Sequence, residues 1–93
     1  MLSSAQKKII SEMFVSYNPL YLGVFGSYAR NEENKNSDLD ILFDSSQPLN
    51  LLDIIGIEQD LSDKLAIKVD LVTLQSVPHQ LMPYIQKDLI NLL

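Results

Sequence analysis

Residues 21–43 read YLGVFGSYARNEENKNSDLDILF, and this stretch decides the fold. It holds two short apolar runs, 21–25 and 39–43, separated by a Gly-Ser turn and a polar segment at 31–37. Short apolar runs bounded by glycine and polar residues are typical of buried strands. A connection of about a dozen residues allows the two strands to pair antiparallel.

The flanking segments predict the rest of a small α/β (α+β) domain. In chain order we expect a helix from Ser3 or Ser4 to about Tyr17, a helix from about Asn50 to Leu65, a strand over 68–73, and a final helix that carries Tyr84, Ile85, Leu89, Leu92 and Leu93. The helix between the second and third strands has crossover length, so these strands should be parallel. The sequence therefore predicts a mixed sheet of at least three strands, packed with helices, in a single domain spanning residues 1–93.

Composition excludes several classes of protein. Twelve acidic residues against seven basic ones give a net charge of -5, and the cations are scattered. Direct binding to long nucleic acid is disfavoured, because that affinity comes mostly from Lys and Arg neutralising phosphates. The sequence has no cysteine and no apolar stretch of the roughly 20 residues that cross a bilayer. We expect a cytoplasmic protein that does not bind membranes.

The predicted topology brings polar residues to one edge of the sheet. The end of the first strand and the starts of the second and third strands should meet there. Gly26 and Ser27 follow the first strand, Asp38 and Asp40 open the second, and Asp70 opens the third. The chain would therefore gather a tight turn and three carboxylates around one point.

The chemistry of these residue types favours a metal and a phosphate. Asp38 and Asp40 are two apart on an extended segment, so both side chains leave the same face. Such a pair is hard to bury without a cation, and Mg²⁺ prefers hard oxygen ligands. With Asp70, three carboxylates suffice for two Mg²⁺ ions and a phosphoryl transfer. Gly26 allows the backbone to approach a phosphate, and Ser27 offers a hydroxyl and an N–H at the start of a short helix.

These motifs resemble those of a known family. The run Gly26-Ser27-Tyr28-Ala29-Arg30, the later Ser37-Asp38-Leu39-Asp40 and then Val69-Asp70-Leu71-Val72 resemble the minimal nucleotidyltransferases of the DNA polymerase beta superfamily. The resemblance implies that Gly26 and Ser27 contact the triphosphate, that Asp38 and Asp40 hold both metals, and that Asp70 helps to bind the metal activating the acceptor. The family usually has Gly where this chain has Asn31, a residue that tolerates the left-handed backbone region.

Small members of this family resemble the antitoxins of two-gene toxin–antitoxin pairs. The resemblance implies a helical ribonuclease toxin of the HEPN type as partner, and transfer of AMP from ATP to a tyrosine of that toxin. We expect no second domain that would bind a small acceptor in this chain, so a partner protein could supply the acceptor. Two alternatives stay open: a binding module that neutralises its partner by occlusion without turnover, and a transferase acting on small molecules.

Several residues have plainer interpretations. Arg30 could contact phosphate or the partner, or form a surface pair with Glu32 or Glu33. Asp70 could pair with Lys68, and Ser37 could orient Asp38 or only begin the strand. His79, the only histidine, is expected to be a loop residue.

The C-terminal region contains more apolar residues than one helical stripe accommodates. They are Leu81, Met82, Tyr84, Ile85, Leu89, Ile90, Leu92 and Leu93. A surface helix normally buries an apolar arc of about 100°, so some of these residues should be exposed and form an interface. The occupant is expected to be the toxin, with a homodimer as the competing possibility.

Overall fold

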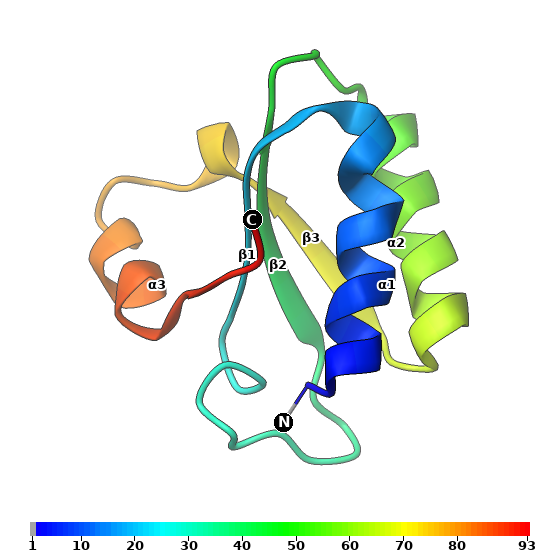
Figure 1. The fold of residues 1–93 in the computed structure, drawn as a ribbon. Coiled ribbons are helices and arrows are strands. Elements are labelled where there is room, and N and C mark those ends of the chain that lie inside the picture. Colours follow the sequence, from blue (N-terminus) through cyan, green and yellow to red (C-terminus); the bar gives the residue numbers. More distant parts are fainter. Residues whose placement is uncertain (1) are drawn as a thin grey trace.

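The fold is built on a four-stranded mixed sheet, seen in a computed structural model that describes residues 2–93 (Figure 1). The strands are β1 (Pro19–Phe25), β2 (Leu39–Ser45), β3 (Val69–Thr73) and β4 (Ile90–Asn91), in the spatial order β3-β2-β1-β4. β1 and β2 are antiparallel, whereas β2 and β3 are parallel. Both pairings agree with the sequence prediction, since a loop joins the first pair and a helical crossover joins the second.

Two helices cover one face of the sheet and a shorter helix lies on the other side (Figure 1). The helices are α1 (Ser4–Phe14), α2 (Leu51–Leu65) and α3 (Met82–Asp88), with 3₁₀ turns η1 (Val15–Tyr17) and η2 (Leu74–Ser76). Ser3 caps α1 in a capping box with Gln6, and Asn50 caps α2 in the same way with Asp53. Each box satisfies backbone N–H groups that a helix start leaves unpaired, which explains where the two helices begin.

The hydrophobic core lies between the sheet and the α1–α2 layer. Its fully buried members include Ile10, Phe14, Leu22, Val24, Leu39, Ile41, Phe43 and Leu61. The rings of Phe14 and Phe43 pack with centroids 4.6 Å apart at an angle of 41°. The alternation of core residues along β2 turns the side chains between them toward the opposite face, on which α3 lies.

The predicted final helix is wrong beyond Asp88. The chain leaves α3 at Leu89, which is extended, and adds β4 antiparallel to β1. The N–H of Leu92 then donates to the carbonyl of Leu22 at 2.8 Å, and Leu92 packs against the core. Gly23 permits this approach, because a Cβ there would lie 3.0 Å from the carbonyl oxygen of Ile90. A glycine inside a strand was the available signal for close backbone approach.

The outer edge of β3 is covered by side chains of α2. The hydroxyl of Ser62 accepts from the N–H of Val69 at 3.0 Å, and Glu58 Oε2 accepts from the N–H of Leu71 at 2.7 Å. These bonds satisfy N–H groups that an edge strand would otherwise present to another chain. Helix α2 therefore both covers the core and closes one side of the sheet.

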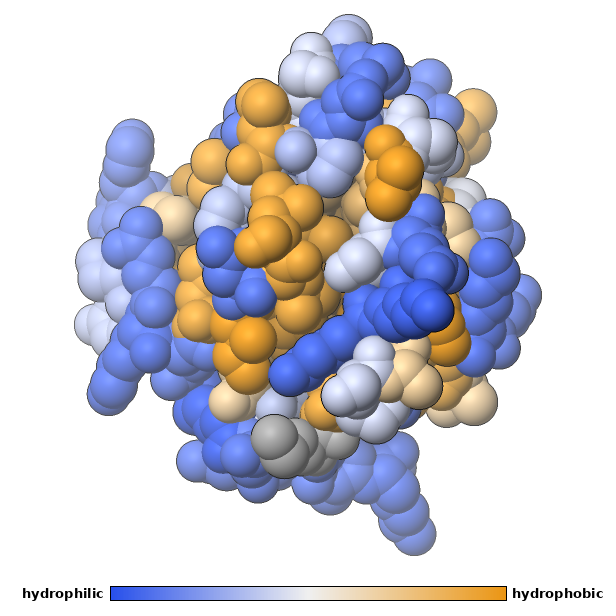
Figure 2. All heavy atoms as spheres, in the orientation of Figure 1, coloured by the Kyte–Doolittle hydropathy of each residue, from blue (hydrophilic) through white to orange (hydrophobic). Residues whose placement is uncertain are grey.

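Apolar side chains also remain on the surface. Leu81 is 51% exposed, Tyr84 73% and Leu93 62%, in agreement with the expectation that the C-terminal region exposes apolar residues. Figure 2 shows apolar atoms gathered around the C-terminal segment and the adjacent side of α3. None of the helices within residues 2–93 has the length and apolar composition that crossing a membrane requires.

Candidate active site

The strand register brings the predicted site residues to one edge of the sheet. Asp40 lies opposite Phe25 on β1 and opposite Asp70 on β3. Asp38 directly precedes β2, and the intervening Leu39 is fully buried in the core. The end of β1 and the starts of β2 and β3 therefore share this edge, as predicted. We call Asp38, Asp40 and Asp70 the carboxylate cluster.

Gly26 lies directly against Asp40. Its φ of 77° is in the region that side-chain-bearing residues rarely adopt. A Cβ at this position would also collide with the Oδ2 atom of the Asp40 carboxylate. Glycine is therefore required twice over, by the backbone turn after β1 and by the space that Asp40 occupies.

The Gly-Ser segment forms consecutive turns, and the short helix expected at Ser27 is absent between residues 26 and 31. The carbonyl of Gly26 accepts from the N–H groups of Ala29 and Arg30, and the carbonyl of Ser27 accepts from Glu32 at 2.9 Å. Asn31 has a φ of 57°, so it occupies the left-handed region as expected for the residue replacing the family's Gly. These hydrogen bonds hold the backbone in a tight turn, and no helix dipole contributes to anion binding here.

This turn leaves donors open for an anion. Within residues 2–93, the N–H groups of Ser27 and Tyr28 donate to no other protein group. Adjacent free N–H groups in a tight turn form a concavity that suits a phosphate oxygen. The geometry is compatible with the predicted role of Gly26 and Ser27.

Asp40 has a raised pKa in the folded protein. Burial, and then the charges of Asp70 and Asp38, raise the pKa of Asp40 from 3.8 to about 6, while Arg30 acts in the opposite direction. Lys68 lies 3.8 Å from Asp38 Oδ2, so the cation considered as a partner for Asp70 pairs with Asp38 instead. Both members of that pair are substantially exposed, so the pair offsets little of the cluster's charge.

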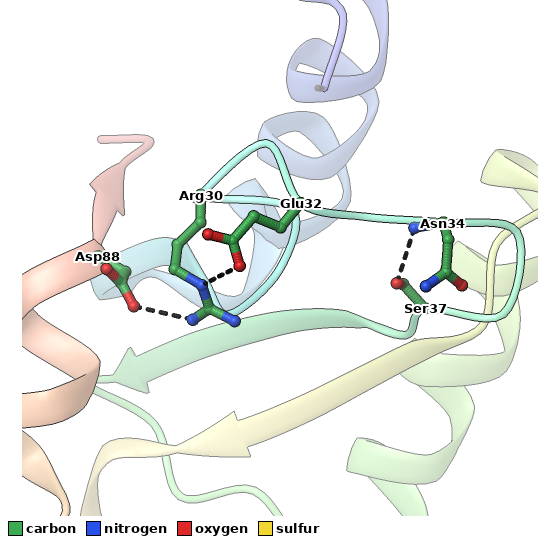
Figure 3. A network of polar contacts seen from close by, with 5 residues as sticks. All are labelled: Arg30, Glu32, Asn34, Ser37 and Asp88. Atoms are coloured by element: carbon green, nitrogen blue, oxygen red, sulfur yellow. Dashed lines mark hydrogen bonds and ion pairs between the residues drawn. The ribbon is translucent and has the colours of Figure 1, made fainter.

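Arg30 is held by two carboxylates (Figure 3). Its Nε donates to Glu32 at 3.1 Å and its Nη1 donates to Asp88 at 2.9 Å. Hydrogen bonds to Asp88 and Glu32 raise the pKa of Arg30, which stays positively charged. The expected surface pair with Glu32 is present. Asp88, at the end of α3, escaped sequence reasoning because no local pattern connects residues 58 apart.

Ser37 closes the loop that leads into Asp38 (Figure 3). Its hydroxyl accepts from the N–H of Asn34 at 2.9 Å, and its own N–H donates to the carbonyl of Asn34 at 3.0 Å. Of the two roles considered for Ser37, starting the strand is therefore the one its contacts match. His79 is exposed in the segment before α3 and does not lie at the cluster's sheet edge.

The donor set of the cluster matches a hard divalent cation. Three carboxylates at one edge supply only oxygen ligands. Burial, and then the charges of Asp70 and Asp38, raise the pKa of Asp40, so a nearby cation would favour its ionised form. Among the described residues, no group of three acidic, His or Cys side chains is close enough together to hold a metal ion. The metal-binding roles of Asp38, Asp40 and Asp70 consequently remain predictions.

The sheet topology, the Gly-Ser turn and the strand-borne carboxylates together define a nucleotidyltransferase fold of the polymerase beta type. A family model described as the nucleotidyltransferase domain matches residues 4–91, and the chain belongs to that family. Within it, the chain is a minimal nucleotidyltransferase, because a structure described as one matches it over most of both chains.

Relatives and solved structures support this placement. A candidate protein adenylyltransferase of Methanocaldococcus jannaschii is 43% identical over 83 residues, covering 89% of this chain and 82% of the relative. The protein adenylyltransferase MntA of Thermococcus cleftensis is 40% identical over 74 residues, covering 80% and 72%. A candidate minimal nucleotidyltransferase structure has a TM-score of 0.81 at 27% identity, covering 92% and 88%. A toxin–antitoxin structure with AMP-PNP has a TM-score of 0.84 at 25% identity, covering 94% and 72%.

Proposed function

We propose that this nucleotidyltransferase transfers AMP from ATP to a hydroxyl of a partner protein, as the antitoxin of a HEPN-type toxin–antitoxin pair. The observation that carries the proposal is the strand register, which sets Asp40 beside Asp70 and against Gly26. Two relatives whose names describe protein adenylyltransferases, and a toxin–antitoxin neighbour with AMP-PNP, support the substrate and the class of partner.

Each part of the site has a role in this reaction. Asp38 and Asp40 would hold two Mg²⁺ ions, and Asp70 would help to hold the one on the acceptor side. Bound there, Mg²⁺ neutralises charge on the triphosphate and on the departing pyrophosphate. The free N–H groups and hydroxyl of the Gly-Ser turn bind phosphate oxygens. Arg30 adds positive charge beside Asp40.

Nucleotidyl transfer exchanges one bond at the α-phosphorus for another. The acceptor oxygen forms a bond to the α-phosphorus of ATP, and the bond from that phosphorus to the bridging oxygen breaks. Pyrophosphate leaves, the acceptor becomes an AMP ester, and the hydroxyl proton passes to a carboxylate of the cluster. The chain's residues contribute by holding both reactants in line and by stabilising the charge that develops.

The proposed metal-binding role of Asp70 can be tested by mutation. Asp70→Asn should lower transfer by about 100-fold or more, because a lost metal ligand removes several kcal/mol of transition-state stabilisation. Transfer of label from α-labelled ATP to a co-expressed HEPN-type toxin measures this. The matched control is Asp44→Asn, on the same face of β2 at the far end of the strand, where Gln75 donates to Asp44 at 2.6 Å. Equal activity of both variants would contradict the role.

The occlusion alternative has its own signature. A wild-type protein that forms the complex and binds Mg²⁺ and ATP, but transfers no label to the partner over hours, would favour it over catalysis.

A further inference from the structure

A pocket of about 280 Å³ lies between α3 and the Gly-Ser turn. It is lined by Phe25, Gly26, Arg30, Leu81, Tyr84, Ile85 and Asp88. From the sequence, Gly26 is expected to contact phosphate, and Arg30 to contact phosphate or the partner or to form a surface pair. The pocket itself has no part in the roles described above.

The pocket adjoins the carboxylate cluster. Phe25 on its floor is the residue that lies opposite Asp40 in the β1–β2 register. Gly26 forms part of its wall, and the missing side chain of Gly26 is what leaves room for the Asp40 carboxylate. A group seated in the pocket therefore contacts the same turn residue, Gly26, that lies against Asp40.

The lining suits an apolar ring better than a charged or sugar group. Its only charged side chains, Arg30 and Asp88, bond to each other at 2.9 Å. A purine would need hydrogen-bond partners along its polar edge, and the engaged pair offers few. A phenol needs partners only for its single hydroxyl, while its ring is stabilised by aromatic and aliphatic contacts.

We propose that this pocket receives the acceptor itself, a tyrosine side chain of the partner protein, and directs its hydroxyl toward the carboxylate cluster. This inference rests on the proposed function and assigns the acceptor's place and chemistry within it. Leu81 and Tyr84 extend the apolar contact beyond the pocket, since they are 51% and 73% exposed. The net charge of -5 favours a basic, RNA-binding partner by charge complementarity.

A pocket-filling variant separates acceptor binding from nucleotide binding. Ile85→Trp should raise the KM for the partner, or lower kcat, by about tenfold or more, because the indole occupies the ring's space. The affinity for Mg²⁺ with a non-hydrolysable ATP analogue should stay within about twofold. The control is Leu52→Trp, which adds the same side chain at a position of α2 that is 78% exposed. Leu81→Lys, at the half-exposed mouth, provides a second variant should Ile85→Trp fold poorly.

A direct binding experiment keeps this inference distinct from the proposed function. p-Cresol, the tyrosine side chain as a free molecule, should shift the methyl NMR signals of Leu81 and Ile85 in the wild type, and should leave the Leu81 signal unchanged in Ile85→Trp. If wild type transfers no AMP but p-cresol binds here, the proposed function fails and the pocket assignment stands. The assignment is overturned if p-cresol leaves these methyl groups unchanged, or if Ile85→Trp weakens nucleotide binding while the KM for the partner is unaltered.

Discussion

At the scale of single residues, the site depends on contacts that allow one amino acid only. Gly26 combines a φ of 77° with the absence of a side chain where Asp40 lies. Asn31 shows the looser case, because its φ of 57° favours Gly but is tolerated by Asn. The first position is constrained by both backbone and packing, and the second by backbone alone. This difference explains how the chain can depart from the family pattern at residue 31.

Asp40 should make stability depend on pH. Its pKa is raised from 3.8 to about 6, so the folded state holds a proton that the unfolded state has already lost between these values. Stability therefore falls as pH rises through this window, and the loss is complete above it. Asp40→Asn should remove the penalty and raise Tm at pH 7.5, but change it little at pH 4.

The expected rise in Tm is modest. Because Asp40 is only partly buried, we take the penalty as about 1 kcal/mol, or roughly 4–8 °C for a domain of this size. Thermal unfolding by circular dichroism in EDTA measures it, with Asp44→Asn as the control at both pH values. An equal shift at pH 4 and pH 7.5 would rule out the ionisation of Asp40 as the cause.

At the scale of elements, the edges of the sheet are closed in two different ways. Helix α2 covers the β3 edge through Ser62 and Glu58, whereas the short β4 covers β1 on the other side. The sequence predicts the starts of α1 and α2 at Ser3 or Ser4 and at about Asn50, and the structure adds Gln6 and Asp53 as the capping-box partners of Ser3 and Asn50. The role of Glu58 is not predicted from the sequence, because its partner, Leu71, becomes its neighbour only when α2 packs on β3.

Removing this edge contact should destabilise the fold. Glu58→Ala leaves the N–H of Leu71 without its charged acceptor, which should cost about 1.5–3 kcal/mol in the free energy of unfolding. Glu58→Gln keeps an acceptor oxygen and should cost less. Urea denaturation of both variants, beside Asp60→Ala on the exposed side of α2, gives the difference. A cost for Glu58→Ala no larger than that for Asp60→Ala would mean that water replaces the bond without penalty.

At the scale of the whole molecule, folding brings the carboxylate cluster to one edge of the sheet before any cation is bound. Two segments distant in sequence contribute to it, and burial together with the charges of Asp70 and Asp38 raises the pKa of Asp40. A cation that binds the folded state alone should therefore stabilise it.

Adding Mg²⁺ at pH 7.5 should raise Tm. At a Mg²⁺ concentration of ten times the Kd, the free energy of unfolding should increase by about 1.4 kcal/mol. The rise should be smaller at pH 5, because the folded Asp40, with its pKa of about 6, must then lose a proton before it can bind. Asp38→Asn should abolish the effect, and Asp44→Asn should preserve it. Differential scanning calorimetry with and without Mg²⁺ provides the measurement. A Tm that does not respond to Mg²⁺ would count against a metal site at this edge.

The sequence by itself determined the order of the elements through Thr73, the pairing of the first three strands and the placing of Gly26, Asp38, Asp40 and Asp70 at one edge. Apolar periodicity, caps and connection length are local properties, and they suffice for these features. Only the tertiary structure decided that residues 90–91 form β4 and that Lys68 faces Asp38. It also joined Arg30 to Asp88 and formed the pocket between α3 and the Gly-Ser turn. These features depend on side chains that are remote along the chain and become neighbours through packing, and no local pattern encodes such contacts.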